Sequence, residues 1–93
     1  MKIVHIQKSP NPNKKYRVSG ATWHVDFGAS GYSDYTKHKD PARKQRYITR
    51  HKKHENWSNE KTAGFWSRWL LWEKPTIAES KKFIKRKFGI LIK

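Results

Sequence analysis

The chain has 93 residues, no cysteine, and 22 Lys and Arg against 7 Asp and Glu, which gives a formal net charge of +15. This length accommodates one domain, and the absence of cysteine excludes disulfides and thiolate metal sites as sources of stability. Because surfaces that serve only solubility usually mix both signs of charge, the excess of cations indicates a polyanionic partner.

The first third of the sequence, residues 1–31, has the patterns of β-strands. Ile3 to Ile6 is β-branched and apolar around one His, which is typical of a short strand. Tyr16 to Val18 and Trp23 to Phe27 alternate in polarity, so the apolar side chains of each segment share one face. Ser19 to Ala21 favours a turn between them. The sequence therefore predicts a β-hairpin with a buried aromatic face.

A first helix is predicted over about residues 40–55. Asp40 can cap the free backbone amides, and Pro41 is tolerated at the first helical position. Ile48 is the main aliphatic anchor of this helix. Most of its surface is therefore expected to face water or phosphate.

Two more helices are predicted, over residues 62–73 and 76–88. The second helix is apolar almost all the way round, which is typical of a central buried helix. The third begins with a capping box at Thr76 and ends at Gly89, which suits the left-handed helix stop. The following segment, 90–92, is apolar enough to add a strand beside the first one. We therefore expect a single α+β domain over residues 1–93, with a small antiparallel β-hairpin or sheet followed by about three helices.

Two groups of cations are candidates for binding nucleic acid. Residues 37 to 53 contain a single acid, Asp40, and the outer face of the third helix forms a second basic surface. Lys and Arg neutralise phosphates and release counterions without reading sequence, and two such surfaces suit bridging or compaction. The predicted binding residues are Lys37, Lys39, Arg43, Lys44, Arg46, Arg50, Lys52, Lys53, Lys81, Lys82, Lys85 and Arg86.

Aromatic residues interleave with the first basic group. Tyr32, Tyr35 and Tyr47 are candidates for stacking on unpaired bases, although tyrosines also commonly supply core area, and packing is the simpler interpretation for each. Trp66, Trp69 and Trp72 follow helical spacing among apolar neighbours, which indicates a core role. Three rings cannot all point inward from one short helix, so one of them is expected to make a protein contact.

Catalytic and metal-binding patterns are weak. His51, His54 and Glu55 do not match the zinc-protease spacing, and flanking lysines repel a cation. Gly28 to Gly31 lacks the features of a phosphate-binding loop and is expected to be a tight connection. We find no coherent set of nucleophile, base and orienting group. The sequence therefore predicts no enzyme, no cofactor and no metal site.

Three stretches carry a family resemblance: Val25 to Asp40, Arg46 to Trp57 and Thr62 to Thr76. Together they resemble a small uncharacterised family of basic proteins encoded by nucleocytoplasmic large DNA viruses, such as phycodnaviruses, iridoviruses and mimivirus relatives. The likeness covers about residues 15 to 88. It implies a viral origin, but no activity and no binding residues. This chain has His54 where family members often have Arg, so no special role follows for that position.

The favoured function is a non-enzymatic, sequence-tolerant nucleic-acid-binding or genome-packaging protein, with DNA as the expected partner. A minor structural protein of the virion is the alternative, with basic faces against acidic capsid proteins and exposed tryptophans fixing it in place. A nuclease is a distant third. No membrane partner is expected, because the longest apolar run, Trp69 to Trp72, is too short to span a bilayer. The expected location is the virion, the host nucleus or a cytoplasmic viral factory.

Overall fold

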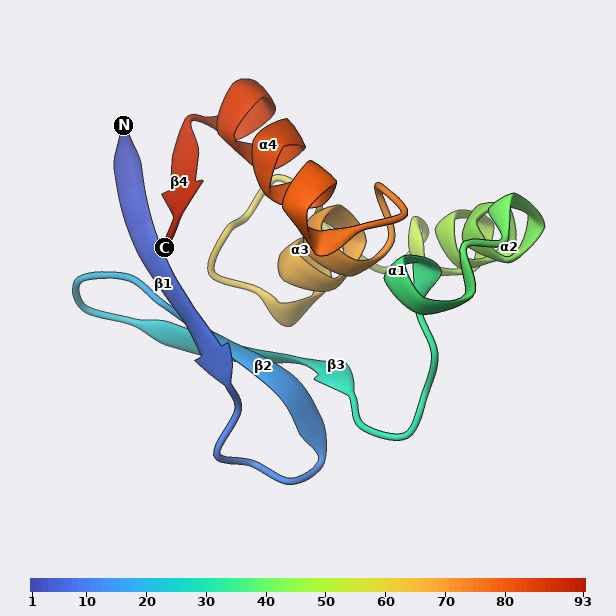
Figure 1. Cartoon of the computed structure of the whole chain (residues 1–93), viewed down its shortest axis with the longest axis horizontal. Helices are drawn as coiled ribbons and strands as arrows, with labels where there is room; N and C mark the ends of the chain where they lie inside the picture. Colours follow the sequence, from blue (N-terminus) through green and yellow to red (C-terminus); the bar gives the residue numbers. More distant parts are fainter.

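Four strands form one mixed sheet in the computed structural model, which describes all residues from 1 to 93 (Figure 1). The strands are β1 (Lys2–Lys8), β2 (Lys14–Ser19), β3 (His24–Ala29) and β4 (Ile90–Ile92), and their order is β3-β2-β1-β4. β1 and β3 are antiparallel to β2, whereas β4 is parallel to β1. The α+β class is confirmed, as is the pairing of the last strand with the first. The sheet is mixed rather than antiparallel as predicted, because β4 pairs in parallel with β1, and it is larger than a simple hairpin.

The predicted hairpin is confirmed in position, and the structure adds its register. Tyr16 lies opposite Phe27, and Val18 lies opposite Val25. Tyr16, Val18, Val25 and Phe27 share one face of the sheet, because residues two apart on a strand point to the same side. This face meets the helices, and Val18 and Phe27 are buried there. At the turn, a β-carbon on Gly20 would lie 2.4 Å from the indole nitrogen of Trp23, so a side chain at this position would collide with the ring.

Four α-helices follow the hairpin where three were predicted: α1 (Tyr35–His38), α2 (Pro41–His51), α3 (Ala63–Trp66) and α4 (Ile77–Phe88). The missed helix, α1, is a single turn. The Asp34 carboxylate accepts a hydrogen bond from the Thr36 amide at its start, and Lys39 ends it in the left-handed conformation at φ 55°. A helix this short gives no periodic signal in the sequence.

The first predicted helix is shorter than expected, and an aromatic residue anchors it more than Ile48 does. α2 ends at His51 instead of Glu55, and a turn follows in which the His54 amide donates to the His51 carbonyl at 3.0 Å. Tyr47 is its buried residue at 5% exposure, whereas Ile48 is only half-buried. The Tyr47 ring stacks on Trp72 at 4.2 Å between centroids and holds α2 against the rest of the molecule.

The second predicted helix is α-helical in its first part and π-helical in its second part. Thr62 caps α3 through its hydroxyl, and the chain continues as a π-helical segment, η1 (Ser67–Leu71). Phe65, Trp66 and Leu70 from this stretch are fully buried and pack with core residues of the sheet. The prediction of a central buried helix is thus confirmed in place, while the wider π-helical turn was not foreseen.

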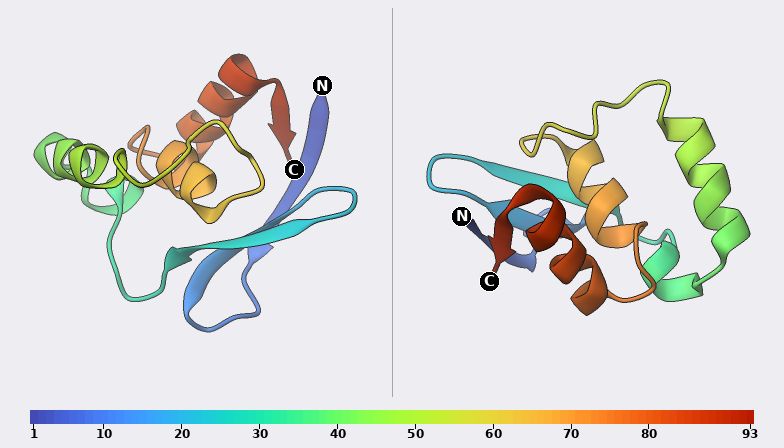
Figure 2. Two further views of the ribbon diagram at one scale, coloured as in Figure 1. Left: turned by 180° about the vertical axis from the view of Figure 1, so that it is seen from behind. Right: turned by 90° about the horizontal axis from the view of Figure 1, so that it is seen from above.

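The third predicted helix is confirmed at both ends. The Thr76 hydroxyl accepts a hydrogen bond from the Glu79 amide at 3.1 Å, and Gly89 ends α4 at φ 69°. Ser80 and Ile84 are buried on its inner face. α3, η1 and α4 lie over one face of the sheet, and α2 lies on the far side of α3 and η1 from α4 (Figures 1 and 2). No helix has the length and apolarity needed to cross a lipid bilayer.

Candidate nucleic-acid interface

A half-open cleft of about 380 Å³ lies between α2, α3 with η1, and the end of the β2–β3 hairpin. α2 contributes Arg43 and Arg50 to its lining, and β2 contributes Lys14 and Lys15. Tyr32 lies on the segment that leads from the hairpin to α1 and also lines this cleft. Cations from two distant parts of the sequence therefore meet in one concave site.

Small residues keep the cleft open, and apolar side chains close its inner end. Leu71 and Trp72 contribute apolar lining. Gly28 adopts φ +79°, where a β-carbon would approach the Leu71 side chain to 3.0 Å. A β-carbon on Gly64 would approach the Glu55 carboxylate to 3.0 Å. Larger residues at these two glycines would therefore push their neighbours and alter the cleft.

The two carboxylates of the cleft are already engaged by the protein. Asp34 is 2% exposed, forms an ion pair with Lys15 at 2.7 Å, and caps α1. Glu55 pairs with His51 at 2.9 Å and accepts a hydrogen bond from the Trp57 indole. No acidic side chain lies within 4.0 Å of the charged groups of Lys14, Arg43 or Arg50. These three cations are therefore uncompensated.

A neighbouring groove of about 420 Å³ extends the positive surface. Lys8, Lys14, Lys15 and Lys37 line it without any acidic residue, and Lys14 and Lys15 are shared with the cleft. We call the joined surface of Lys8, Lys14, Lys37, Arg43 and Arg50 the basic tract. Lys8 and Lys14 were missed from sequence, because only strand pairing places them beside the first basic group. The Lys14-Lys15 pair that opens β2 was the available signal.

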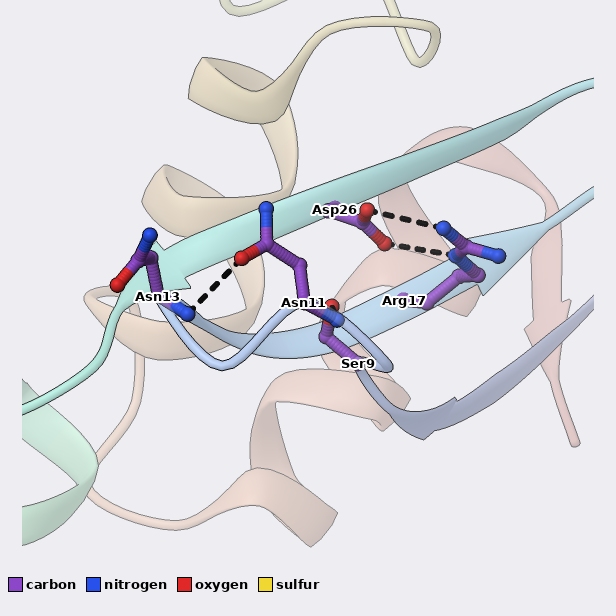
Figure 3. Close-up of polar contacts among 5 residues, drawn as sticks. All are labelled: Ser9, Asn11, Asn13, Arg17 and Asp26. Atoms are coloured by element: carbon purple, nitrogen blue, oxygen red, sulfur yellow. Dashed lines mark hydrogen bonds and ion pairs between the residues drawn. The ribbon is translucent and has the colours of Figure 1, made fainter.

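The loop between β1 and β2 fixes the position of Lys14. The Asn13 amide donates to the Asn11 side chain at 2.9 Å (Figure 3), and the Asn11 amide donates to the Ser9 hydroxyl at 3.0 Å. The Lys14 amide closes the loop on the Asn11 carbonyl, and the Ser30 amide donates to the Asn13 carbonyl. The start of β2 is therefore tied to the connection that leads toward Tyr32.

Charge elsewhere on the sheet is balanced. Arg17 on β2 donates two hydrogen bonds to Asp26 on β3, at 2.7 and 3.0 Å (Figure 3). These bonds from the guanidinium lower the pKa of the Asp26 carboxyl, since they stabilise its charged form.

Across the chain, four of the 22 Lys and Arg, namely Lys2, Lys15, Arg17 and Arg68, form ion pairs with a carboxylate, which leaves eighteen that do not.

The predicted cations of the first group are placed in different ways. Arg46 and Arg50 lie along the outer face of α2, and Arg50 also lines the cleft together with Arg43. Lys52 and Lys53 are exposed beyond the end of α2. Lys37 and Lys39 are exposed on and just after α1, and the Lys39 ammonium donates to the Thr36 carbonyl at 2.9 Å.

Lys44 is the exception in this group, because its side chain turns inward. Its ammonium donates to the Glu73 carbonyl at 2.8 Å and lies 5.2 Å from the centre of the Tyr35 ring. Burial lowers its pKa, since desolvation disfavours the charged form. Lys44 thus joins α2 to the segment after η1, and we leave it out of the basic tract.

The three candidate stacking tyrosines differ in their exposure. Tyr32 is 74% exposed at the cleft, and Tyr35 is half-buried with its ring 6.2 Å from that of His38. Tyr47 is covered on its two faces by Trp72 and His51, at 4.2 and 4.3 Å, and burial raises its pKa. A ring covered in this way is not free to stack on a base, so the packing interpretation holds for Tyr47.

The second predicted basic surface lies on α4, apart from the cleft. Lys82, Lys85 and Arg86 are exposed and Lys81 is half-buried, and none of the four lines the cleft. The Arg86 guanidinium lies 5.7 Å from the centre of the Phe83 ring on the same helix. The structure therefore keeps the two predicted basic groups as separate surfaces.

The histidines do not gather into one cluster, and the tryptophans pack within the fold. His54 lies beyond the end of α2, so it does not share a helix face with His51. The structure contains no group of three or more His, Asp or Glu side chains that could hold a metal ion. None of the five tryptophans is exposed: Trp69 stacks on Phe83, and Trp72 stacks on Tyr47. The expectation that one of Trp66, Trp69 and Trp72 makes a protein contact stays a prediction.

Comparison with known proteins supplies a family but no activity. The model of the Family of unknown function (DUF5754) matches residues 4–51. The chain belongs to this family. The DUF5754 match spans β1, β2, β3, α1 and α2, and so includes every residue of the basic tract and Tyr32. No curated protein and no solved structure shows a significant match. The viral origin implied by the resemblance stays a prediction.

Proposed function

We propose that this protein binds nucleic acid without sequence preference, through the basic tract, and that DNA is its partner. The observation that carries the proposal is the convergence of Lys14, Arg43 and Arg50 on one cleft that has no free carboxylate. These side chains come from β2 and from opposite ends of α2, so the fold brings them together although the sequence separates them. Such an arrangement is suited to a phosphate backbone, which needs positive charge at repeated separations.

The charge of the whole chain supports the same partner. Eighteen uncompensated Lys and Arg repel one another and oppose the compact state, and a bound polyanion relieves that repulsion. Contacts from Lys and Arg to phosphates position a protein on nucleic acid but carry no sequence information. We therefore infer a sequence-tolerant, non-enzymatic binder that works in covering or packaging a genome.

The test is fluorescence anisotropy with a short labelled DNA, repeated over a salt series. If the basic tract and its surroundings neutralise about six phosphates, raising the salt from about 50 to about 200 mM weakens binding roughly a thousandfold. The Arg43→Ala/Arg50→Ala variant lowers the slope of log K against log salt by about 2, because two phosphate contacts are lost. A salt-independent affinity, or no binding at low salt with micromolar protein, would rule out the proposal.

A matched control removes the same charge elsewhere. Lys61 and Lys93 are exposed and do not line the cleft, so Lys61→Ala/Lys93→Ala lowers the net charge by the same amount. We expect this control to keep the slope of the unchanged protein. Equal losses in the two variants would mean that net charge alone drives binding and that the basic tract is not the site.

The alternative of a minor virion structural protein loses one of its supports. It relied on exposed tryptophans to hold the protein against a capsid, and all five tryptophans are buried or half-buried. What remains is charge attraction to an acidic protein surface. Copurification with capsid protein at high salt, where phosphate contacts are screened, would favour this alternative.

A further inference from the structure

The cleft has the size of a site for a small group. Ligand pockets in proteins range from about 300 to about 1,000 Å³, and this cleft, at about 380 Å³, lies near the lower end of that range. A single base with its sugar and phosphate is a group of this size. A duplex keeps its bases stacked inside and can touch only the rim of such a cleft.

Tyr32 gives the cleft an aromatic surface that the fold itself does not use. It is 74% exposed and its hydroxyl has no hydrogen-bond partner in the protein. The turn before it holds the ring at the edge of the cleft: Gly31 adopts φ +83°, and the Tyr32 amide donates to the Ala29 carbonyl at 3.4 Å. A single exposed aromatic residue is ordinary on a protein surface, but here it lines a cavity that also contains uncompensated cations.

The cations flank this ring from two sides. Lys14 comes from the hairpin and Arg43 and Arg50 come from α2, while all three line the same cleft as Tyr32. Proteins that bind single strands combine cations that follow the backbone with aromatic rings on which bases stack. A base can stack only on an aromatic ring whose face is free. The Tyr32 ring is free, whereas the Tyr47 ring is covered by His51 and Trp72.

We propose that the cleft binds an unpaired nucleotide, with its base on Tyr32 and the adjacent phosphates on Arg43, Arg50 and Lys14. This rests on the proposed function and narrows it, because it makes single-stranded nucleic acid the preferred substrate. A duplex then binds more weakly, through phosphate contacts alone. Every base has a stacking face, so the preference for strand type requires no preference for sequence.

The experiment compares a single-stranded thymidine oligonucleotide with a duplex of the same length, at one salt concentration, for Tyr32→Ala and Tyr32→Phe. We expect Tyr32→Ala to weaken binding of the single strand by about five- to a hundredfold and to leave duplex affinity unchanged, because only the stacked base is lost. Tyr32→Phe keeps the ring and binds like the unchanged protein. A single-stranded RNA arm shows whether the cleft distinguishes the two sugars.

The outcomes separate this inference from the proposed function. Salt-sensitive duplex binding with no preference for single strands, or with no effect of Tyr32→Ala, overturns the inference and leaves the proposed function standing. An equal loss of single-strand and duplex binding in Tyr32→Ala also overturns it. No binding to either form overturns both. Because Tyr32 packs against little, circular dichroism is expected to show an unchanged fold for both variants.

Discussion

The two basic surfaces of this molecule carry similar charges but are built in different ways. On α4, the exposed cations Lys82, Lys85 and Arg86 follow one another on a single convex helix face. In the cleft, Arg43 and Arg50 meet Lys14 only because the hairpin packs beside the α3 segment. A helix face needs only local spacing, whereas a concave site needs the tertiary fold. Equal charge therefore does not mean equal capacity to bind, and the comparison can be tested at several points.

The largest expected effect comes from replacing Tyr47, because its ring holds α2, which forms one wall of the cleft. The basic surface on α4 does not depend on this ring. Tyr47→Ala removes the ring that stacks on Trp72 and is expected to cost about 3 to 5 kcal/mol of unfolding free energy. Chemical denaturation measures the loss, and DNA binding is expected to fall with it as α2 loosens. Tyr47→Phe keeps the stacked ring and is expected to cost about 1 kcal/mol or less. An equal loss in both variants would mean that the hydroxyl, rather than the ring, holds α2.

Removing two positive charges from each surface in turn compares the two surfaces directly. An oligonucleotide of about 10 nucleotides can occupy only one of the two basic surfaces of a protein molecule at a time. We expect Arg43→Ala/Arg50→Ala to weaken binding by about tenfold or more, and Lys82→Ala/Lys85→Ala to change it by less than about threefold. Titrations at equal salt measure both. The reverse ranking would place the main site on α4.

The helix caps provide a smaller and sharper test. The Asp40 carboxylate accepts a hydrogen bond from the Ala42 amide at the start of α2, and the Thr76 hydroxyl does the same for the Glu79 amide on α4. Asp40→Ala and Thr76→Ala are each expected to cost about 1 kcal/mol of stability. Thermal unfolding measures this loss. Asp40→Ala also removes a negative charge beside the basic tract, so its DNA binding is compared with that of Asp40→Asn, which removes the same charge but keeps a capping side chain. We expect Asp40→Ala to bind DNA more weakly than Asp40→Asn, since it loosens a helix that lines the cleft; a binding loss in Thr76→Ala would contradict this separation.

The smallest effect is expected from His38, the last residue of α1. Its Nδ1 accepts a hydrogen bond from the Asp40 amide at 3.0 Å, and its ring lies 5.3 Å from Trp72. Burial, helped by the charge of Arg43, lowers the pKa of His38 despite the nearby carboxylates of Asp40 and Asp34.

Because the folded-state pKa of His38 is below its unfolded value of about 6.5, the unfolded chain binds more protons in this range. Stability is therefore expected to be present above pH 6.5 and to fall on acidification. Denaturation between about pH 7.5 and pH 5.5 measures it. His38→Asn keeps an acceptor but does not titrate, so it reduces this dependence. The same pH dependence in both proteins would assign it to other groups.

Local signals in the sequence were enough for most of the fold. The alternation of polarity around Tyr16 and Val25 predicted the hairpin and the residues that share its face, and Thr76 and Gly89 predicted both ends of α4. These features depend on residues close together in the chain.

Features that depend on tertiary contacts were not predictable in this way. No Gly or Pro marks the end of α2 at His51, where a turn closed by the His54 amide and the His51 carbonyl follows. The anchoring role of Tyr47 depends on Trp72, which lies 25 positions further along. Lys14 could not be assigned to the cleft, because no local pattern relates it to α2. The candidate site was therefore predicted on α2 but not across to the hairpin.

The parallel pairing of β4 with β1 has a consequence for the order of folding. Lys2 lies opposite Ile90, and Val4 lies opposite Ile92, so this part of the sheet joins residues almost the whole chain apart. Ile90 and Ile92 are also core residues. The hydrophobic core therefore cannot be completed until β4 has met β1, and closing this long-range pairing is expected to be a slow step in folding.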